Sequence, residues 1–277
     1  MTDFTTLRLD LAHRVAVLWL AREKLRNAFN ETMIAELAAA FTQLGADAGV
    51  RAIVLAAQGP AFCVGADLDW MRRMAGYSDE ENRRDALALA TMLRTVAECP
   101  KPVVARVHGD AYAGGVGLVA ACDIVVAAQT ATFCLSETKL GLIPATIGPH
   151  VVRAIGERQA RRYALTAEKF DAAEAFRIGL VQELVAPDAL DARVNEILGA
   201  LMLTSDAAVI EAKRLVRDVA GQPLTDALLA DTAQRIARVR ASADGREGVA
   251  SFLDKRKPRW VVEFEQQSSG SDEDEEM

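Results

Sequence analysis

The chain has 277 residues, 51% of them hydrophobic and 26% charged, and its formal net charge at pH 7 is −7. This size and composition suit one or two globular domains with a sizeable core, and the acidic balance argues against nucleic acid as a main partner. The N-terminal MTDFTTLRLD lacks the basic and apolar regions of a signal peptide, and no apolar run is long enough to span a membrane, so we expect a cytoplasmic protein.

Short apolar runs typical of β-strands recur along the first two thirds of the chain. They are RVAVLWL (14–20), VRAIVLAAQ (50–58), PVVARVHG (102–109), DIVVAA (123–128) and GLVQELV (179–185). Helical patterns lie between several of these runs, and this alternation predicts an α/β body.

Two amphipathic helices are predicted within this body. The first covers 30–44, where Asn30 is a suitable N-cap and apolar residues recur at helical spacing. The second covers 79–99, where an acidic start suits a helix N-terminus and Leu89, Leu93 and Val96 form one apolar stripe.

Beyond Pro187 the strand pattern stops and only helical patterns follow. The last stretch, QQSSGSDEDEEM, is polar and acidic and carries no core-forming residues, so we expect a disordered tail. The predicted organisation is an α/β core at 1–186, a helical segment at 187–260 and the tail at 261–277.

The cysteines and histidines do not predict a metal site. Neither set has the spacing of metal ligands, and the widely separated cysteines are typical of reduced thiols. The residues are Cys63, Cys99, Cys122, Cys134, His13, His108 and His150.

Two adjacent glycines, Gly114 and Gly115, separate a strand-like run from a helix-like run. A phosphate-binding loop is a weak interpretation, because no Gly-Lys-Ser/Thr follows and the dinucleotide-binding spacing is absent. The glycines can instead simply allow a helix to start against a sheet. A third interpretation is an oxyanion hole, in which a backbone N–H at a helix N-terminus holds negative charge on an acyl oxygen. That interpretation needs a second N–H donor, which the turn Gly65-Ala66-Asp67 could supply.

These two turns, in this order, resemble the crotonase (enoyl-CoA hydratase/isomerase) superfamily. The resemblance runs from about Val15 to Trp260 and includes FCVGADL, PKPVVARVHGDAYAGGVGL, ATFCLSETKLGLIPATIG and FLDKRKPRW. It implies a spiral of ββα units followed by a helical trimerisation segment, assembled as a trimer or a dimer of trimers. It also implies an oxyanion hole made by the N–H groups of Ala66 and Gly114. Coenzyme A would be part of the substrate, and no separate cofactor is expected.

The same resemblance assigns the acid–base chemistry. Two-glutamate hydratases of the family carry one glutamate three residues after the oxyanion glycine, where this chain has Gly117, and a second where it has Glu137. Glu137 is therefore the predicted proton donor and acceptor, and the apolar LGLIP beside it would raise its pKa. Ala145 stands where other family members use an aspartate, which argues against dehalogenase and dienoyl-isomerase reactions.

Further substrate contacts are implied by the resemblance, although solvated surface charge and loop carboxylates bonded to their own turns are alternatives for the polar ones. The cations expected near coenzyme A are Lys24, Arg26, Lys255 and Lys257. The residues expected around the acyl group and the two turns are Ala28, Gly65, Asp67, Leu68, Asp110, Tyr112 and Gly115.

The resemblance is nearest to bacterial methylglutaconyl-CoA hydratases, which act in leucine or acyclic-isoprenoid degradation. It implies hydration of a branched, acidic enoyl-CoA, whose distal carboxylate could pair with Arg72, Arg73 or Lys139. A Δ3-Δ2 enoyl-CoA isomerase and a non-catalytic acyl-CoA-binding trimer are the alternatives. Without a glutamate at Gly117, another polar group or the substrate's own carboxylate could hold the water. Gly117→Glu would then be expected to raise hydration of a straight-chain ester, provided that the added side chain fits the start of the helix.

Overall fold

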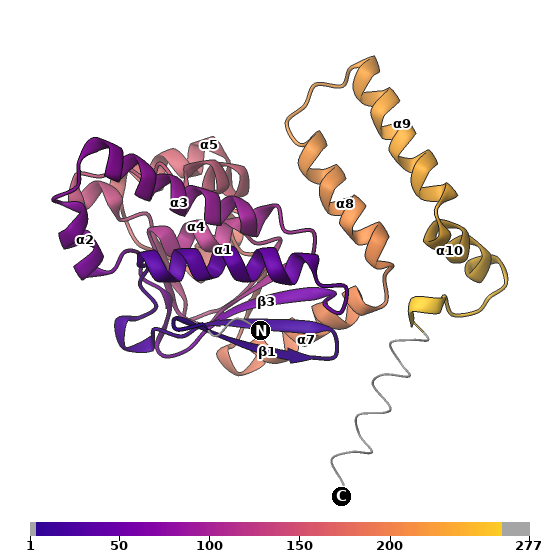
Figure 1. Ribbon diagram of the computed structural model, residues 1–277, viewed down its shortest axis with the longest axis horizontal. Coiled ribbons are helices and arrows are strands. Elements are labelled where there is room, and N and C mark those ends of the chain that lie inside the picture. Colours follow the sequence, from indigo (N-terminus) through magenta and orange to yellow (C-terminus); the bar gives the residue numbers. More distant parts are fainter. Residues whose placement is uncertain (1–3, 262–277) are drawn as a thin grey trace, which may run out of the picture. The chain divides into compact units, whose positions relative to one another are not determined.

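The computed structural model describes residues 4–261, so nearly all of the predicted acidic tail lies outside the described residues. Two compact units make up this part of the chain (Figure 1). The first contains residues 4–99 and 103–195, and the second contains residues 100–102 and 196–261. None of the helices between residues 4 and 261 combines the length and the apolarity that crossing a bilayer requires.

A six-stranded sheet forms the base of the first unit, in the order β1-β2-β3-β5-β7-β10. The strands are β1 (Leu7–Ala12), β2 (Val15–Leu20), β3 (Ala52–Ala57), β5 (Val103–Val107), β7 (Ile124–Ala128) and β10 (Glu183–Val185). Only β1 and β2 pair antiparallel, and the remaining pairs are parallel. Every residue of β3 is buried, as expected for a parallel strand covered on both faces.

A second, four-stranded sheet has the order β4-β6-β8-β9. Its strands are β4 (Ala61–Cys63), β6 (Asp110–Tyr112), β8 (Thr132–Cys134) and β9 (Phe170–Asp171). Along the chain, β3, β5 and β7 of the first sheet are each followed by a strand of the second and then by a helical turn or helix. This repetition is the predicted ββα spiral, so the predicted fold is confirmed.

Both predicted amphipathic helices are confirmed. The first is α1 (Glu31–Ala46), whose N-cap Asn30 accepts a hydrogen bond from the Met33 N–H. The second is α3 (Asp79–Ala97), which begins with a capping box between Ser78 and Glu81. In Figure 1 they lie side by side over the strands.

The other helical elements of the first unit connect the strands. They are η1 (Glu23–Leu25), α2 (Leu68–Met74), α4 (Gly114–Ala121), η2 (Glu137–Leu140), α5 (Gly148–Thr166), α6 (Ala172–Arg177) and η3 (Pro187–Ala189). The buried helix α4 has no apolar stripe because nearly all of its side chains are apolar and covered.

The second unit is helical, as predicted for the C-terminal segment. It contains the end of α7 (Leu190–Met202), then α8 (Asp206–Val219), α9 (Asp226–Ala241) and α10 (Ala243–Leu253). Ser205 caps α8 and also donates to Asp244 of α10 at 2.6 Å. Several large apolar side chains of this unit are exposed on the single chain, among them Leu224, Phe252 and Leu253.

Candidate active site

A cavity of about 410 Å³ lies in the first unit, beside the start of α4. Its wall brings together all three residues predicted to be catalytic, Ala66, Gly114 and Glu137. Most of the remaining wall is apolar and includes Phe29, Trp70, Met74, Leu89, Leu142 and Ile143. Such a pocket suits an acyl chain with a few polar groups placed at the reacting end.

The N–H of Ala66 is available as a donor because the backbone pairing between Phe29 and Ala66 leaves it unused. Phe29 and Ala66 form a parallel bridge through bonds from the Phe29 N–H to the Gly65 carbonyl, at 2.7 Å, and from the Asp67 N–H to the Phe29 carbonyl, at 2.8 Å. In this pattern the N–H of Ala66 itself points away from Phe29. No group among residues 4–261 accepts a hydrogen bond from it.

The N–H of Gly114 is available because Gly114 is the first residue of α4, where a helix leaves its N–H groups unpaired. The preceding Ala113 has φ 46° and ψ −118°, a costly conformation for a residue with a side chain. Its N–H donates to the Cys134 carbonyl at 2.8 Å, which helps to hold this backbone in place. The two turns touch, since a Cβ on Gly65 would lie only 3.1 Å from the Cβ of Ala113.

Glu137 begins η2 and is half-buried. Its Oε2 is buried and has no hydrogen-bond partner among the described residues. Burial raises the pKa of this carboxyl group above its usual value, and a backbone hydrogen bond lowers it only in part. A carboxyl group that lines the cavity and has one oxygen without an internal partner can exchange a proton with a bound molecule.

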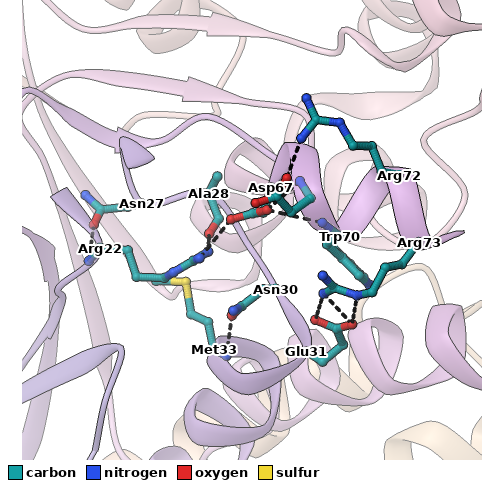
Figure 2. A network of polar contacts seen from close by, with 11 residues as sticks. Arg22, Asn27, Ala28, Asn30, Glu31, Met33, Asp67, Trp70, Arg72 and Arg73 are labelled. Atoms are coloured by element: carbon teal, nitrogen blue, oxygen red, sulfur yellow. Dashed lines mark hydrogen bonds and ion pairs between the residues drawn. The ribbon is translucent and has the colours of Figure 1, made fainter. Parts of the chain in front are cut away.

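A buried ion pair braces the turn that carries Ala66 (Figure 2). The Arg22 guanidinium lies 2.8 Å from Asp67 Oδ2, and the two side chains are 14% and 9% exposed. Asp67 Oδ1 also accepts hydrogen bonds from the N–H groups of Asp69 and Trp70, which start α2. These bonds hold the pKa of Asp67 below its usual value despite its burial. Asp67 therefore positions the turn and does not line the cavity.

The same network fixes the loop before α1. Arg22 donates to the Ala28 carbonyl, and its own N–H donates to Oδ1 of Asn27 at 2.9 Å. Asn27 is fully buried and donates to the carbonyls of Gln58 and Ala61. Ala28, predicted as a substrate contact, belongs to this support and is buried.

The other predicted substrate contacts in the first unit also lie outside the cavity wall. Arg26 pairs with Asp110 at 2.7 Å, and Asp110 accepts a hydrogen bond from Thr132. Tyr112 bonds to the same threonine at 2.8 Å, so its hydroxyl belongs to that cluster. The remaining ones are Lys24 in η1, Gly65, the exposed Leu68 and Gly115, whose close neighbour is the Cys63 carbonyl.

Lys255 and Lys257 lie in the second unit, and their predicted contact with coenzyme A stays a prediction. No three His, Cys, Asp or Glu side chains in residues 4–261 are grouped so that they could hold a metal ion.

Two of the cavity residues that were not predicted from the sequence, Trp70 and Asp85, are joined by a hydrogen bond. Trp70 is 3% exposed, and its Nε1 donates to Oδ1 of Asp85 at 3.1 Å. Asp85 lies in α3, one helical turn before the predicted apolar stripe that starts at Leu89, and both residues line the cavity. The i, i+4 spacing from Asp85 to Leu89 was the available signal, because it places both on one face of the helix.

Comparisons with known proteins agree with this geometry. The family model described as enoyl-CoA hydratase/isomerase matches residues 10–263. The chain belongs to the enoyl-CoA hydratase/isomerase family. A crotonyl-CoA hydratase of Syntrophomonas wolfei is 31% identical over 258 residues, which are 91% of this chain and 96% of the relative.

Solved structures are similar over nearly the same length of the chain. A crystal structure of an enoyl-CoA hydratase from Shewanella pealeana superposes with a TM-score of 0.90 at 39% identity, covering 93% of this chain and 97% of that one. Pseudomonas aeruginosa AtuE gives a TM-score of 0.89 at 38% identity, covering 93% of this chain and all of the other.

In this member of the enoyl-CoA hydratase/isomerase family, Ile147 packs directly against Gly117. A Cβ on Gly117 would lie 2.1 Å from Cγ2 and 2.6 Å from Cβ of Ile147, which lines the cavity. The expected gain from Gly117→Glu depended on room for the added side chain at the start of the helix. The structure does not meet this condition, because Ile147 occupies the space that any side chain at position 117 would need.

We expect Gly117→Ala to lower the free energy of unfolding by about 1–3 kcal/mol, the usual cost of overpacking a core. Urea denaturation measures this change. Ile147→Ala in the same chain should relieve part of it, so that the two substitutions are less than additive. Gly148→Ala is the matched control, since a Cβ there meets nothing within 4 Å. Equal stability of the Gly117→Ala and Gly148→Ala variants would contradict the packing described.

Proposed function

We propose that the protein adds water reversibly to the double bond of a 2-enoyl-CoA thioester. The observation that supports this function is the meeting of two backbone N–H donors and a carboxyl group with one oxygen free of internal partners, all in a single cavity. The names of the family and of its hydratase relatives support the same reaction.

The chemistry follows from these groups. The thioester oxygen accepts hydrogen bonds from the N–H groups of Ala66 and Gly114, and negative charge develops on this oxygen as water attacks C3. Two fixed donors in an apolar cavity stabilise that charge better than water does, and one such donor is worth about 10²–10³ in rate. The carboxyl group of Glu137 then delivers a proton to C2. In the reverse direction Glu137 removes that proton.

Incubation with crotonyl-CoA and with 3-butenoyl-type esters separates this proposal from its alternatives. Hydration adds the mass of water, whereas an isomerase converts a 3-enoyl to a 2-enoyl ester without a change in mass. Binding of both esters with neither conversion would support the non-catalytic acyl-CoA-binding alternative and contradict the proposal.

For the substrate class we propose a short, branched and acidic ester of the 3-methylglutaconyl-CoA type. Its support is the sequence resemblance, together with a cavity wall that includes Thr146, a residue with a hydroxyl group. Arg72, Arg73 and Lys139 do not line the cavity, and the first two pair with Asp69 and Glu31. A distal carboxylate would therefore rely on hydroxyl or backbone donors of the wall.

We expect kcat/KM for 3-methylglutaconyl-CoA to exceed that for crotonyl-CoA by about 10–100-fold, which corresponds to one hydrogen bond to a charged group. Steady-state kinetics with both esters measure the ratio. The uncharged 3-methylcrotonyl-CoA is the control, since it has the branch without the acid. Equal values for all three esters would contradict recognition of the carboxylate and leave the hydration proposal standing.

We also propose assembly as a homotrimer or a dimer of trimers. The resemblance supports it, and so do the large exposed apolar side chains that the second unit carries on the single chain.

A further inference from the structure

The proposed hydration leaves one group unassigned, namely the acceptor for the proton of the attacking water. The position where two-glutamate relatives would carry it is Gly117, which has no side chain and no room for one. Of the two positions where such relatives carry a glutamate, only the one at Glu137 has an acid in this chain. A second positioned acid–base group is worth about 10²–10⁴ in rate, so its absence would be costly.

The cavity does contain a second carboxyl group, contributed by a different element. Asp85 comes from α3 and lines the same cavity as Ala66, Gly114 and Glu137. Its Oδ1 accepts the Trp70 Nε1–H at 3.1 Å, and Trp70 is itself almost fully buried, so the carboxyl group is held in one orientation. No group among residues 4–261 donates a hydrogen bond to Oδ2, which leaves this oxygen available to a bound molecule.

We propose that Asp85 holds and deprotonates the water that adds to C3, while Glu137 protonates C2. This inference rests on the hydratase function proposed above. The water oxygen forms a bond to C3 and one water proton passes to Asp85. The electron pair of the C2–C3 double bond moves into the thioester, where Ala66 and Gly114 hold the enolate oxygen. That electron pair then takes the proton of Glu137 at C2. Exchange with solvent returns a proton from Asp85 to Glu137 and restores both groups.

The surroundings of the two carboxyl groups suit this division of roles. Burial raises the pKa of Glu137, and no cation of residues 4–261 pairs with it, which favours its protonated form. Burial also raises the pKa of Asp85, and the charge of Glu31 acts in the same direction. The Trp70 N–H and the Arg73 guanidinium oppose this shift only in part. Burial acts on both carboxyl groups in the same direction, so the roles are assigned from their contacts: Oδ1 of Asp85 is held by the Trp70 N–H, whereas Oε2 of Glu137 has no partner among the described residues.

Two reactions of the same protein distinguish a catalytic role of Asp85 from a structural one. Hydration of crotonyl-CoA needs the water, whereas exchange of the C2 protons of butyryl-CoA in D₂O needs only Glu137 and the oxyanion donors. We expect Asp85→Asn to lower kcat for hydration by about 10²–10⁴-fold while C2 exchange continues near the wild-type rate. Asparagine keeps Oδ1 as an acceptor for Trp70, so the variant should fold, and thermal unfolding checks this.

Asp79→Asn is the matched control, because it alters an exposed carboxyl group at the start of the same helix. It should leave both reactions unchanged. Hydration by Asp85→Asn at a rate close to wild type would overturn the proposal, and so would an equal fall of hydration and exchange, which would indicate a positioning role through Trp70. Failure of the wild-type protein to hydrate any enoyl-CoA would instead refute the hydratase function itself.

Discussion

Replacing Glu137 by glutamine should reduce turnover by about 10²–10⁴-fold, the range measured for loss of one positioned acid–base group. The glutamine side chain has nearly the same shape but cannot deliver or take the proton at C2. Binding of the acyl-CoA should persist, because the oxyanion donors are backbone N–H groups of Ala66 and Gly114. Turnover by mass-resolved assay and affinity by calorimetry test the two halves of this expectation.

Unlike Asp85→Asn, this variant should also lose C2 proton exchange, since both reactions use Glu137. Glu157→Gln serves as the control, because Glu157 is exposed and pairs with Arg161 on α5. Near wild-type turnover of the Glu137→Gln protein would show that Glu137 does not transfer the proton.

The pH dependence of hydration should also report the protonation of Glu137. Burial raises the pKa of Glu137, so its protonated form persists to higher pH than that of an exposed glutamate. Because hydration uses the protonated form, its rate should fall as pH rises through this raised pKa. The residual activity of the Glu137→Gln variant should not show this fall. If the variant keeps the pH profile of the wild type, the fall is caused by another group.

Asp67→Asn should lower the free energy of unfolding by about 3–5 kcal/mol, because it leaves the buried Arg22 charge without its partner. Asparagine retains an oxygen for the N–H groups that start α2, so loss of the charge is the main change. Since Ala66 immediately precedes Asp67, kcat should fall as well. Urea denaturation and steady-state kinetics measure the two effects.

Asp69→Asn offers a matched comparison in the same turn. Asp69 pairs with Arg72, but those side chains are 76% and 74% exposed, and exposed pairs contribute little to stability. If Asp69→Asn lowered the free energy of unfolding as much as Asp67→Asn does, the buried pair would contribute no more to stability than the exposed one.

The elements of this protein could be predicted because their signals are local. The stripe of α3 and the cap at Asn30 are visible within one stretch of sequence, as are the glycine turns around Ala66 and Gly114. Asp85 was missed because its meaning depends on a tryptophan 15 residues away and on a cavity built by other elements. The contact of Ile147 with Gly117 was missed for the same reason, because Ile147 lies 30 residues further along the chain.

Arg26 and Asp110 show a second kind of information that the sequence lacks. Each was predicted as a substrate contact, and the fold brings them together across 84 residues and pairs them with each other. An internal partner of this kind depends on the tertiary arrangement and has no local signal, and the contacts of both residues with the substrate stay predictions.

The contact between Gly117 and Ile147 also constrains how such an enzyme can diverge. A lineage that gained a glutamate at position 117 first would pass through an overpacked intermediate of low stability, whereas a prior change of Ile147 to a smaller residue leaves only a void. The two substitutions are therefore ordered, with Ile147 changing before Gly117. Ancestors or laboratory populations moving toward a second glutamate at this helix should carry a reduced side chain at position 147 before the acid arrives.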